Sequence, residues 1–193
     1  MKLILALGNP GDRYRDTRHN AGWWLADHLG RRWSLPPFRR EGPEASTGGR
    51  VGDESVRIVK PLTYMNRSGR VLAKYLAATD FRPEDDLLVV VDDTALPPGR
   101  FRLRGRGSGG GHKGLLSVED CLQSREYPRL RIGVGAPGDR EVALTDWVLA
   151  SPSAKEEEAI LEQFSRMALA VEAWIEEGVE NAMNAFNSGQ GGR

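Results

Sequence analysis

Cysteine is almost absent from this chain of 193 residues, where Cys121 is the one thiol. A disulfide framework and a cysteine-rich zinc site are therefore excluded. No apolar run approaches the ~18 residues that a membrane span needs. The apolar start, residues 1–7, is interrupted by Gly8-Asn9-Pro10 too early for a secretory signal. We therefore expect a cytoplasmic protein without a membrane segment.

Motifs for covalent and metal-assisted catalysis are missing as well. The chain holds no Gly-x-Ser-x-Gly sequence, and Cys121 falls within a predicted helix with no histidine nearby. The three histidines, at positions 19, 28 and 112, lack the His-Glu-x-x-His spacing of a zinc site. These absences favour direct attack by water, with no metal and no cofactor.

Charge is balanced overall, with 27 basic and 27 acidic side chains, but it is unevenly distributed. From residue 151 onward there are three cations and eight anions, whereas residues 99–131 hold eight cations and three anions. This cationic stretch is either a solvated face or a phosphate-binding patch. Arginine supplies 22 of the 27 cations, and its guanidinium offers a bidentate fork to phosphate oxygens, which favours the patch.

Alternating strand and helix patterns predict a single α/β domain over residues 1–187, with a mixed, mostly parallel sheet and helices on both faces. Strands are expected at 2–7, 55–61, 87–91, 100–104 and 130–135. Helices are expected at 19–32, 67–78 and 114–124, and from Ser153 onward, where Ser153 and Glu156 form a capping box. Residues 36–54, rich in proline and glycine, predict a loop with at most a poor strand. Residues 188–193 predict a disordered tail.

Polar residues follow three of the predicted strands. Asn9 follows the first, Tyr64 and Asn66 follow the second, and Asp92 ends the third. Because ligands of α/β sheets bind beyond the carboxyl ends of the strands, we expect these residues at one rim. Each also has a structural explanation: Asn9 as a turn residue, Asn66 as a helix cap and Asp92 as a strand-end cap.

His19 lies at the start of the first predicted helix. A carboxylate at the rim, such as Asp92, would hold the imidazole and fix its tautomer, so that the other ring nitrogen takes a proton from water. A lone histidine is otherwise more often structural. The hypothesis therefore requires His19 and Asp92 to meet across the rim.

A glycine-dense loop, residues 105–111, precedes His112 and Lys113 and formally contains Gly-x-Gly-x-x-Gly. The strand before it is half-exposed and cationic, unlike the buried strand of a dinucleotide site, and Lys113 lacks the context of a Walker A lysine. A nucleotide-dependent enzyme is thus the weakest alternative. The loop is either purely structural or lets the backbone approach a large ligand.

Four motifs, in order and along essentially the whole chain, resemble those of the bacterial-type peptidyl-tRNA hydrolase family. They are Gly8-Asn9-Pro10-Gly11 with Tyr14-x-x-Thr-Arg-His-Asn-x-Gly22, Thr63-Tyr64-Met65-Asn66-x-Ser-Gly69, Asp92-Asp93-x-x-Leu96-Pro97-Pro98-Gly99, and Gly107-Ser-x-Gly-Gly-His112-x-Gly114-Leu115. The resemblance implies hydrolysis of the ester that joins a peptide to the tRNA 3′ end. It also implies a monomer that binds the acceptor end of peptidyl-tRNA and uses no metal or cofactor.

The resemblance also implies roles for individual residues. His19 would be the base that activates water, Asp92 would hold it, and Asn9 would discriminate N-blocked from free aminoacyl-tRNA. Contacts with substrate or tRNA are implied for Tyr14, Tyr64, Asn66, His112, Lys113, Arg104 and Arg131, the two arginines holding phosphate. Val148 and Leu149 match a mobile segment over the cleft.

Three departures from the family pattern involve four positions. Lys113 stands where asparagine is usual, Thr94 and Ala95 replace a Leu-Asp pair, and Tyr64 replaces a common phenylalanine. Lysine keeps donors but loses the acceptor and adds a charge, which favours contact with phosphate. These departures leave open a second function, that of a non-catalytic RNA-binding relative. The presence of His19 and Asp92 favours the hydrolase.

Overall fold

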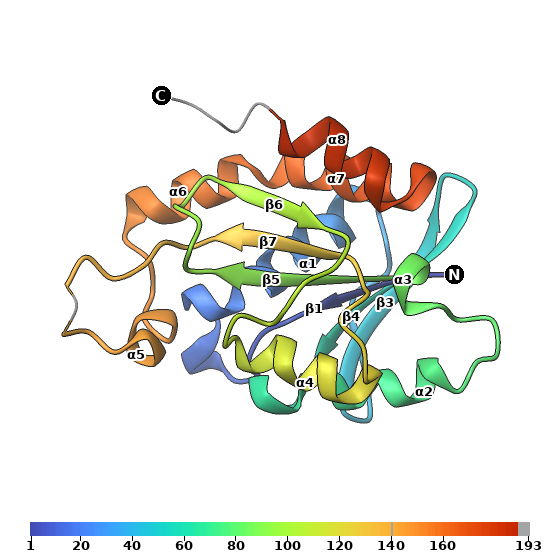
Figure 1. Ribbon diagram of the computed structural model, residues 1–193, viewed down its shortest axis with the longest axis horizontal. Coiled ribbons are helices and arrows are strands. Elements are labelled where there is room, and N and C mark those ends of the chain that lie inside the picture. Colours follow the sequence, from blue (N-terminus) through green and yellow to red (C-terminus); the bar gives the residue numbers. More distant parts are fainter. Residues whose placement is uncertain (140, 189–193) are drawn as a thin grey trace.

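A seven-stranded sheet runs through the computed structural model, which describes residues 1–139 and 141–188 (Figure 1). Its order is β2-β3-β4-β1-β5-β7-β6. The strands are β1 (Lys2–Ala6), β2 (Arg39–Glu41), β3 (Glu44–Val51), β4 (Glu54–Pro61), β5 (Leu87–Asp93), β6 (Phe101–Arg104) and β7 (Arg129–Gly133).

The centre of the sheet is parallel and its borders are antiparallel, as a mixed sheet requires. Strand β1 pairs in parallel with β4 and β5, and β5 pairs in parallel with β7. Strands β2 and β3 extend one border and β6 extends the other, each antiparallel to its neighbour. The carboxyl ends of β4, β1, β5 and β7 therefore meet at one rim.

Helices cover both faces, which confirms the predicted fold class. The helical elements are η1 (Asp12–Tyr14), η2 (Arg18–Asn20), α1 (Ala21–Arg32), η3 (Met65–Leu72), α2 (Ala73–Leu76), α3 (Pro83–Asp86), α4 (Lys113–Leu122), α5 (Leu144–Val148), α6 (Ala154–Glu162), α7 (Phe164–Glu177) and α8 (Val179–Asn187). One core packs Ile4 and Val90 against α1 and Trp174 of α7. The other packs Leu5 against η3 and α4. Covering on both faces explains why residues 3–6 of β1 and 87–91 of β5 are continuous apolar runs.

The prediction of a loop over residues 36–54 is wrong. Strand β3 pairs with β4 along its whole length, from Glu44 opposite Pro61 to Val51 opposite Glu54. One of the glycines that suggested a loop, Gly48, is required by the pairing itself. A Cβ on Gly48 would lie 2.8 Å from the carbonyl oxygen of Val56.

Two helix predictions also need correction. The segment from Ser153 onward forms three helices, broken at Gln163 and at Gly178, whose φ of 85° suits glycine. The capping box is confirmed, since Ser153 and Glu156 exchange hydrogen bonds at the start of α6. Residues 67–78 are mostly the 3₁₀ segment η3, followed by the short α2.

The last helix is attached to the border strand β6. The side-chain Nδ2 of Asn187 donates to the carbonyl oxygen of Leu103 at 3.0 Å, and its Oδ1 accepts from the Leu103 N–H at 2.9 Å. Ser188 donates to the carbonyl oxygen of Asn184. The rest of the predicted tail, residues 189–193, lies outside the described residues. Among the helices described, none is both long and apolar enough to cross a membrane.

Candidate active site

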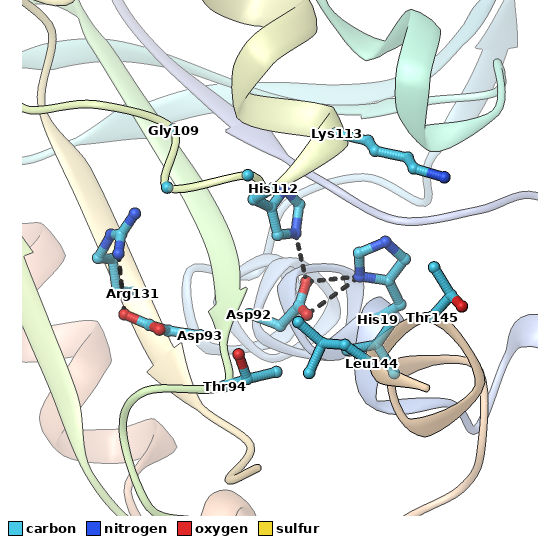
Figure 2. Close-up of a pocket in the computed structure, with 13 residues that line it drawn as sticks. His19, Asp92, Asp93, Thr94, Gly109, His112, Lys113, Arg131, Leu144 and Thr145 are labelled. Carbon is cyan, nitrogen blue, oxygen red and sulfur yellow. Dashed lines mark hydrogen bonds and ion pairs between the residues drawn. The ribbon is translucent and has the colours of Figure 1, made fainter. Parts of the chain in front are cut away.

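A cavity of about 190 Å³ opens beyond the carboxyl ends of β5 and β7 (Figure 2). Distant segments of the chain line it: η2, the end of β5, the loop before α4, β7 and α5. The lining residues are His19, Asp92, Asp93, Thr94, Gly109, Gly110, Gly111, His112, Lys113, Arg131, Leu144, Thr145 and Val148. The rim predicted from strand ends is therefore a real concavity.

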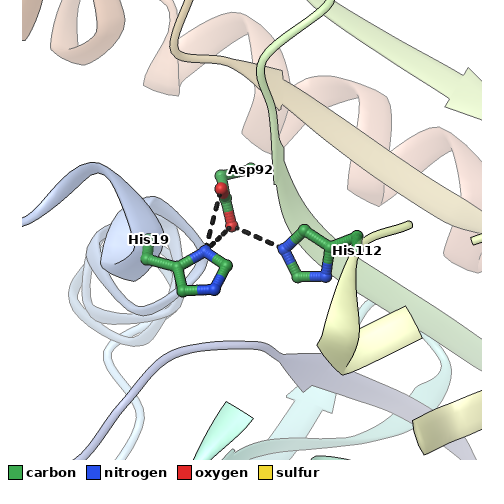
Figure 3. Close-up of side chains that lie close together, drawn as sticks. All are labelled: His19, Asp92 and His112. Atoms are coloured by element: carbon green, nitrogen blue, oxygen red, sulfur yellow. Dashed lines mark hydrogen bonds and ion pairs between the residues drawn. The ribbon is translucent and has the colours of Figure 1, made fainter. Parts of the chain in front are cut away.

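His19 and Asp92 meet in this cavity, as the sequence hypothesis required (Figure 3). Nδ1 of His19 lies 3.0 Å from each carboxylate oxygen of Asp92. Asp92 is 3% exposed. Burial opposes its ionisation, but the neighbouring His112 and His19 outweigh burial and hold the pKa of Asp92 well below its usual value. Asp92 is thus a carboxylate across the physiological pH range.

His112 is a second imidazole on the same carboxylate. Its Nε2 lies 2.9 Å from Oδ1 of Asp92, while its Nδ1 accepts from the backbone N–H groups of Gly114 and Leu115 at the N-terminus of α4. Because Nδ1 accepts, the proton of a neutral ring resides on Nε2, which donates to Asp92. The predicted contact of His112 with substrate stays a prediction. Its contact with Asp92 was not predicted, because the sequence showed only that His112 follows the glycine loop.

The three side chains also form a group with metal-ligand atoms within 4.8 Å of one another. The tautomer of His112 argues against a metal there. A metal on Nε2 would need that nitrogen deprotonated, yet Nδ1 already accepts from the backbone of α4, so the ring would have to be an imidazolate. The donor set fits a carboxylate with two N–H donors better than a metal site.

Asn9 is not among the residues that line the cavity; hydrogen bonds to Asn20 of η2 and to Met65 of η3 hold it in place. Its backbone N–H donates to Oδ1 of Asn20 at 2.8 Å, and Nδ2 of Asn20 donates back to the Asn9 carbonyl at 3.0 Å. The side-chain Oδ1 of Asn9 accepts from the N–H of Met65 at 2.8 Å. Within the described chain Nδ2 of Asn9 has no acceptor, so it is the free donor of this amide. Asn20, which fixes the loop, was not singled out from the sequence although it adjoins His19.

Of the other predicted contacts, Tyr14, Tyr64 and Asn66 are not among the residues that line the cavity. Tyr14 is half-buried, with the guanidinium of Arg13 4.5 Å from its ring centre. Tyr64 is 57% exposed and Asn66 is exposed at the start of η3. Lys113 does line the cavity, from the N-terminus of α4, and its amine has no hydrogen bond or ion pair with any described residue.

Arginines line an adjoining cavity of about 360 Å³, which shares Asp93, Gly110 and Arg131 with the first. Strand β6 buries Phe101 and Leu103 and turns Arg102 and Arg104 to the solvent side. Arg106 also lines this cavity, and Arg131 donates to Asp93 at 3.0 Å. The cationic stretch is therefore gathered on one surface beside His19.

Arg129 also borders this cavity, but unlike Arg102 and Arg104 it is almost entirely buried. It is 1% exposed and donates to the backbone carbonyls of Gly107, Arg125 and Tyr127. It supports the glycine loop from beneath. Positive φ angles at Gly107, Gly110 and Gly111 explain why this loop needs glycine.

Helix α5 supplies a wall that the sequence did not predict as such. Leu144, Thr145 and Val148 line the cavity (Figure 2). Val148 is buried, whereas Leu149, flagged with it from the resemblance, is 41% exposed and is not among the lining residues. A helix of five residues is too short to produce a periodic signal.

Known proteins match the chain over nearly its full length. A family model described as Peptidyl-tRNA hydrolase matches residues 3–192. The peptidyl-tRNA hydrolase of Gemmatimonas aurantiaca is 47% identical over 189 residues, covering 96% of this chain and 99% of that protein. That of Symbiobacterium thermophilum is 44% identical, covering 97% and 99%. The crystal structure of peptidyl-tRNA hydrolase from Acinetobacter baumannii has a TM-score of 0.89 at 32% identity, covering 97% of this chain and 95% of that one.

Proposed function

Because this chain belongs to the peptidyl-tRNA hydrolase family and is a hydrolase of peptidyl-tRNA, we propose that the ester is cleaved at His19, in the cavity that it shares with Asp92. The observation that carries this proposal is the contact of 3.0 Å between Nδ1 of His19 and the Asp92 carboxylate. It provides a base and its orienting group at the rim where ligands of such sheets bind.

His19 acts as the general base. With Nδ1 bonded to Asp92, Nε2 is the nitrogen left to accept a proton from water as the water oxygen attacks the ester carbonyl carbon. The Asp92 carboxylate stabilises the imidazolium that forms. The tetrahedral intermediate then collapses: the bond between the carbonyl carbon and the ribose oxygen breaks, and the imidazolium returns its proton to that oxygen. The products are a free peptide carboxyl group and a free tRNA 3′ end.

Amide groups near the base orient the ester. Nδ2 of Asn9 is a free donor because its Oδ1 is occupied by Met65. A fixed N–H donor of this kind binds the acyl carbonyl and favours N-blocked substrates over free aminoacyl groups. Asn66, exposed at the next strand end, binds the substrate close to the ester. Tyr14 and Tyr64 contact the tRNA end, and Tyr64 presents an exposed ring for stacking.

The arginine-lined cavity holds tRNA phosphate. Arg104 and Arg131 lie beside the hydrolytic cavity, and guanidinium groups bind phosphate oxygens in pairs. Lys113, an unpaired amine in the wall of the hydrolytic cavity, adds a cation for the 3′ end. His112 contributes through Asp92.

The test is hydrolysis of N-acetyl-aminoacyl-tRNA by the wild type and by His19→Ala. Turnover should fall by at least ~100-fold with little change in tRNA affinity, because a general base acts on the rate and not on binding. His28→Ala is the matched control, because it removes an imidazole of α1 that does not line the cavity. An unchanged rate in His19→Ala would remove His19 from the mechanism. RNA binding by a wild type that forms no product would instead favour a non-catalytic relative.

The working form is a cytoplasmic monomer, residues 1–187 acting as one domain. All residues of the proposed site come from one chain, so no second copy is needed to complete it. Sedimentation at the concentration used in the assay measures the oligomeric state. An active protein that sediments only as a dimer would contradict the proposal of a monomer.

A further inference from the structure

Arg18 directly precedes His19 in η2, and the hydrolysis mechanism does not use it. The residue is 3% exposed. Burying a charged guanidinium is costly unless it is paired and hydrogen-bonded. Its partners therefore show what its placement stabilises.

Those partners lie on α5 and on the segment leading from α5 into α6. Nη1 of Arg18 donates to the carbonyl oxygens of Trp147, Ala150 and Ser151 at 3.3, 3.3 and 3.0 Å. The guanidinium carbon lies 3.6 Å from the centre of the Trp147 ring. Nη2 donates to Oε2 of Glu156 at 2.9 Å. One side chain thus joins the end of α5 to the start of α6.

The end of α5 is where a cation stabilises the helix most. The last carbonyl groups of a helix have no partners within it, and the helix dipole is negative there. Glu156 completes the arrangement. Burial opposes its ionisation, but hydrogen bonds from Ser153 and the nearby Arg18 together lower the pKa of Glu156. The ion pair between Arg18 and Glu156 therefore persists into mildly acidic solution.

Helix α5 has little else to hold it. Val148 is its one buried residue, and Leu144, Thr145 and Asp146 are exposed. Apart from the bonds to Arg18, one side-chain hydrogen bond of α5 is found among the described residues, from Nε1 of Trp147 to the carbonyl oxygen of Gly135 at 2.7 Å. Yet Leu144, Thr145 and Val148 form the wall beside His19 (Figure 2).

We propose that Arg18 is a positioning residue that fixes α5 as the wall of the hydrolytic cavity. This inference rests on the proposed function, because it takes the acyl group of the ester to lie against that wall. The side chain of Arg18 holds α5 in place, and the residue that follows Arg18 in η2 is the proposed base, His19. Loss of the guanidinium frees α5 and weakens the grip on substrate, whereas the contact between His19 and Asp92 does not involve it.

Hydrogen exchange measures how firmly α5 is held and does not depend on an assay of activity. In Arg18→Lys and Arg18→Gln, the amides of Leu149 and Ala150, which bond within α5, should exchange about tenfold faster or more, because local opening is no longer resisted. Arg129→Lys is the matched control. It alters an equally buried arginine that also binds backbone carbonyls, but on the glycine loop, so these two amides should keep their protection.

Kinetics supply the second readout. The KM for N-acetyl-aminoacyl-tRNA should rise roughly fivefold or more in Arg18→Lys, while the pH profile of kcat keeps its wild-type shape. Unchanged protection of α5 in a folded Arg18 variant overturns the proposal, as does a fall in kcat with KM unmoved. If neither Arg18 variant folds, Glu156→Gln must produce the same faster exchange, and normal protection there overturns the proposal. If the Arg18 variants exchange faster than the wild type, but the wild type hydrolyses no N-acetyl-aminoacyl-tRNA, only the proposed function is refuted.

Discussion

Asp92 accepts from two imidazoles at once, and this double contact defines what each can do. Among the described residues Nε2 of His19 has no partner, whereas both ring nitrogens of His112 are hydrogen-bonded. Under the proposed mechanism, His112 holds the Asp92 carboxylate and His19 activates the water. Because the pKa of Asp92 lies well below its usual value, this side chain remains a carboxylate in mildly acidic solution.

Replacing the carboxylate with an amide of the same shape should disable this arrangement. In Asp92→Asn, one side-chain position becomes an N–H₂ donor facing the N–H groups of His19 and His112, so the tautomer of His19 is no longer selected. We expect kcat to fall by roughly 10²- to 10⁴-fold, measured with N-acetyl-aminoacyl-tRNA. A neighbouring substitution, Thr94→Ser, is the control. Near-normal kcat in Asp92→Asn would show that His19 works without its partner.

At the level of secondary-structure elements, the turned-out face of β6 predicts the response to salt. Each phosphate contact contributes a slope of roughly −0.7 to −0.9 to log affinity against log salt. Arg104→Ala should flatten the slope by about one contact. Arg131→Ala should do so too, but it also frees Asp93, so its loss of affinity at low salt should be larger. If both variants keep the wild-type slope, the surface around Arg104 and Arg131 does not bind phosphate. Arg50→Ala, on strand β3, is the control and should leave the slope unchanged.

The packing of η3 on α4 requires a glycine at position 69. A Cβ on Gly69 would lie 2.0 Å from the carbonyl oxygen of Ser117, and the Gly69 N–H donates to the Ser117 hydroxyl at 3.0 Å. Gly69→Ala should lower the free energy of unfolding by about 1–3 kcal/mol or more, measured by urea denaturation. At Gly138 nothing lies within 4 Å of an added Cβ, so Gly138→Ala is the matched control. Equal losses in both variants would contradict this packing argument.

Elements with a strong pattern were predictable, and those built by tertiary pairing were not. Strand β5 is apolar because both faces are covered, and β6 alternates because one face is open, so each is visible in sequence. Strand β3 was not, because its glycines carry no side-chain pattern and its identity comes from pairing with β4. The break at Gly178 was missed for a related reason: helical spacing continues beyond it.

The candidate site divides in the same way. The meeting of His19 and Asp92 followed from a general rule about strand ends, because β1, β4 and β5 run in parallel to one rim. The contacts of Arg18 with α5 join residues about 130 positions apart, and nothing in the local pattern of either segment announces them. The contact of two imidazoles with Asp92 likewise depends on the geometry of the loop before α4, which places His112.

For the whole molecule, His28 predicts how folding stability changes with pH. Its Nε2 is buried without a partner among the described residues, and its ring meets the edge of Phe164 at 5.5 Å between ring centres. Burial lowers the pKa of His28, and Arg31 and Arg32 lower it further. The unfolded chain, with the ordinary and higher value, therefore takes up this proton first as the pH falls. Stability present above the ordinary histidine pKa is lost as the pH falls towards the lower, folded value.

The variant His28→Gln should remove that loss. We expect the unfolding free energy of the wild type to fall more steeply than that of His28→Gln between about pH 7.5 and pH 5. Urea denaturation at several pH values measures the difference, which should shrink or reverse in favour of the variant at acid pH. Parallel curves for the two proteins would show that His28 does not govern acid stability.

The bonds between Asn187 and Leu103 have a consequence for solubility. A border strand with open backbone groups is a template on which another chain can add, which is a common beginning of aggregates. In this protein a side-chain amide on the final helix takes up the N–H and C=O of Leu103 in the middle of β6. Helix α8 therefore protects the molecule from edge-to-edge assembly at the border strand that carries the exposed Arg102 and Arg104.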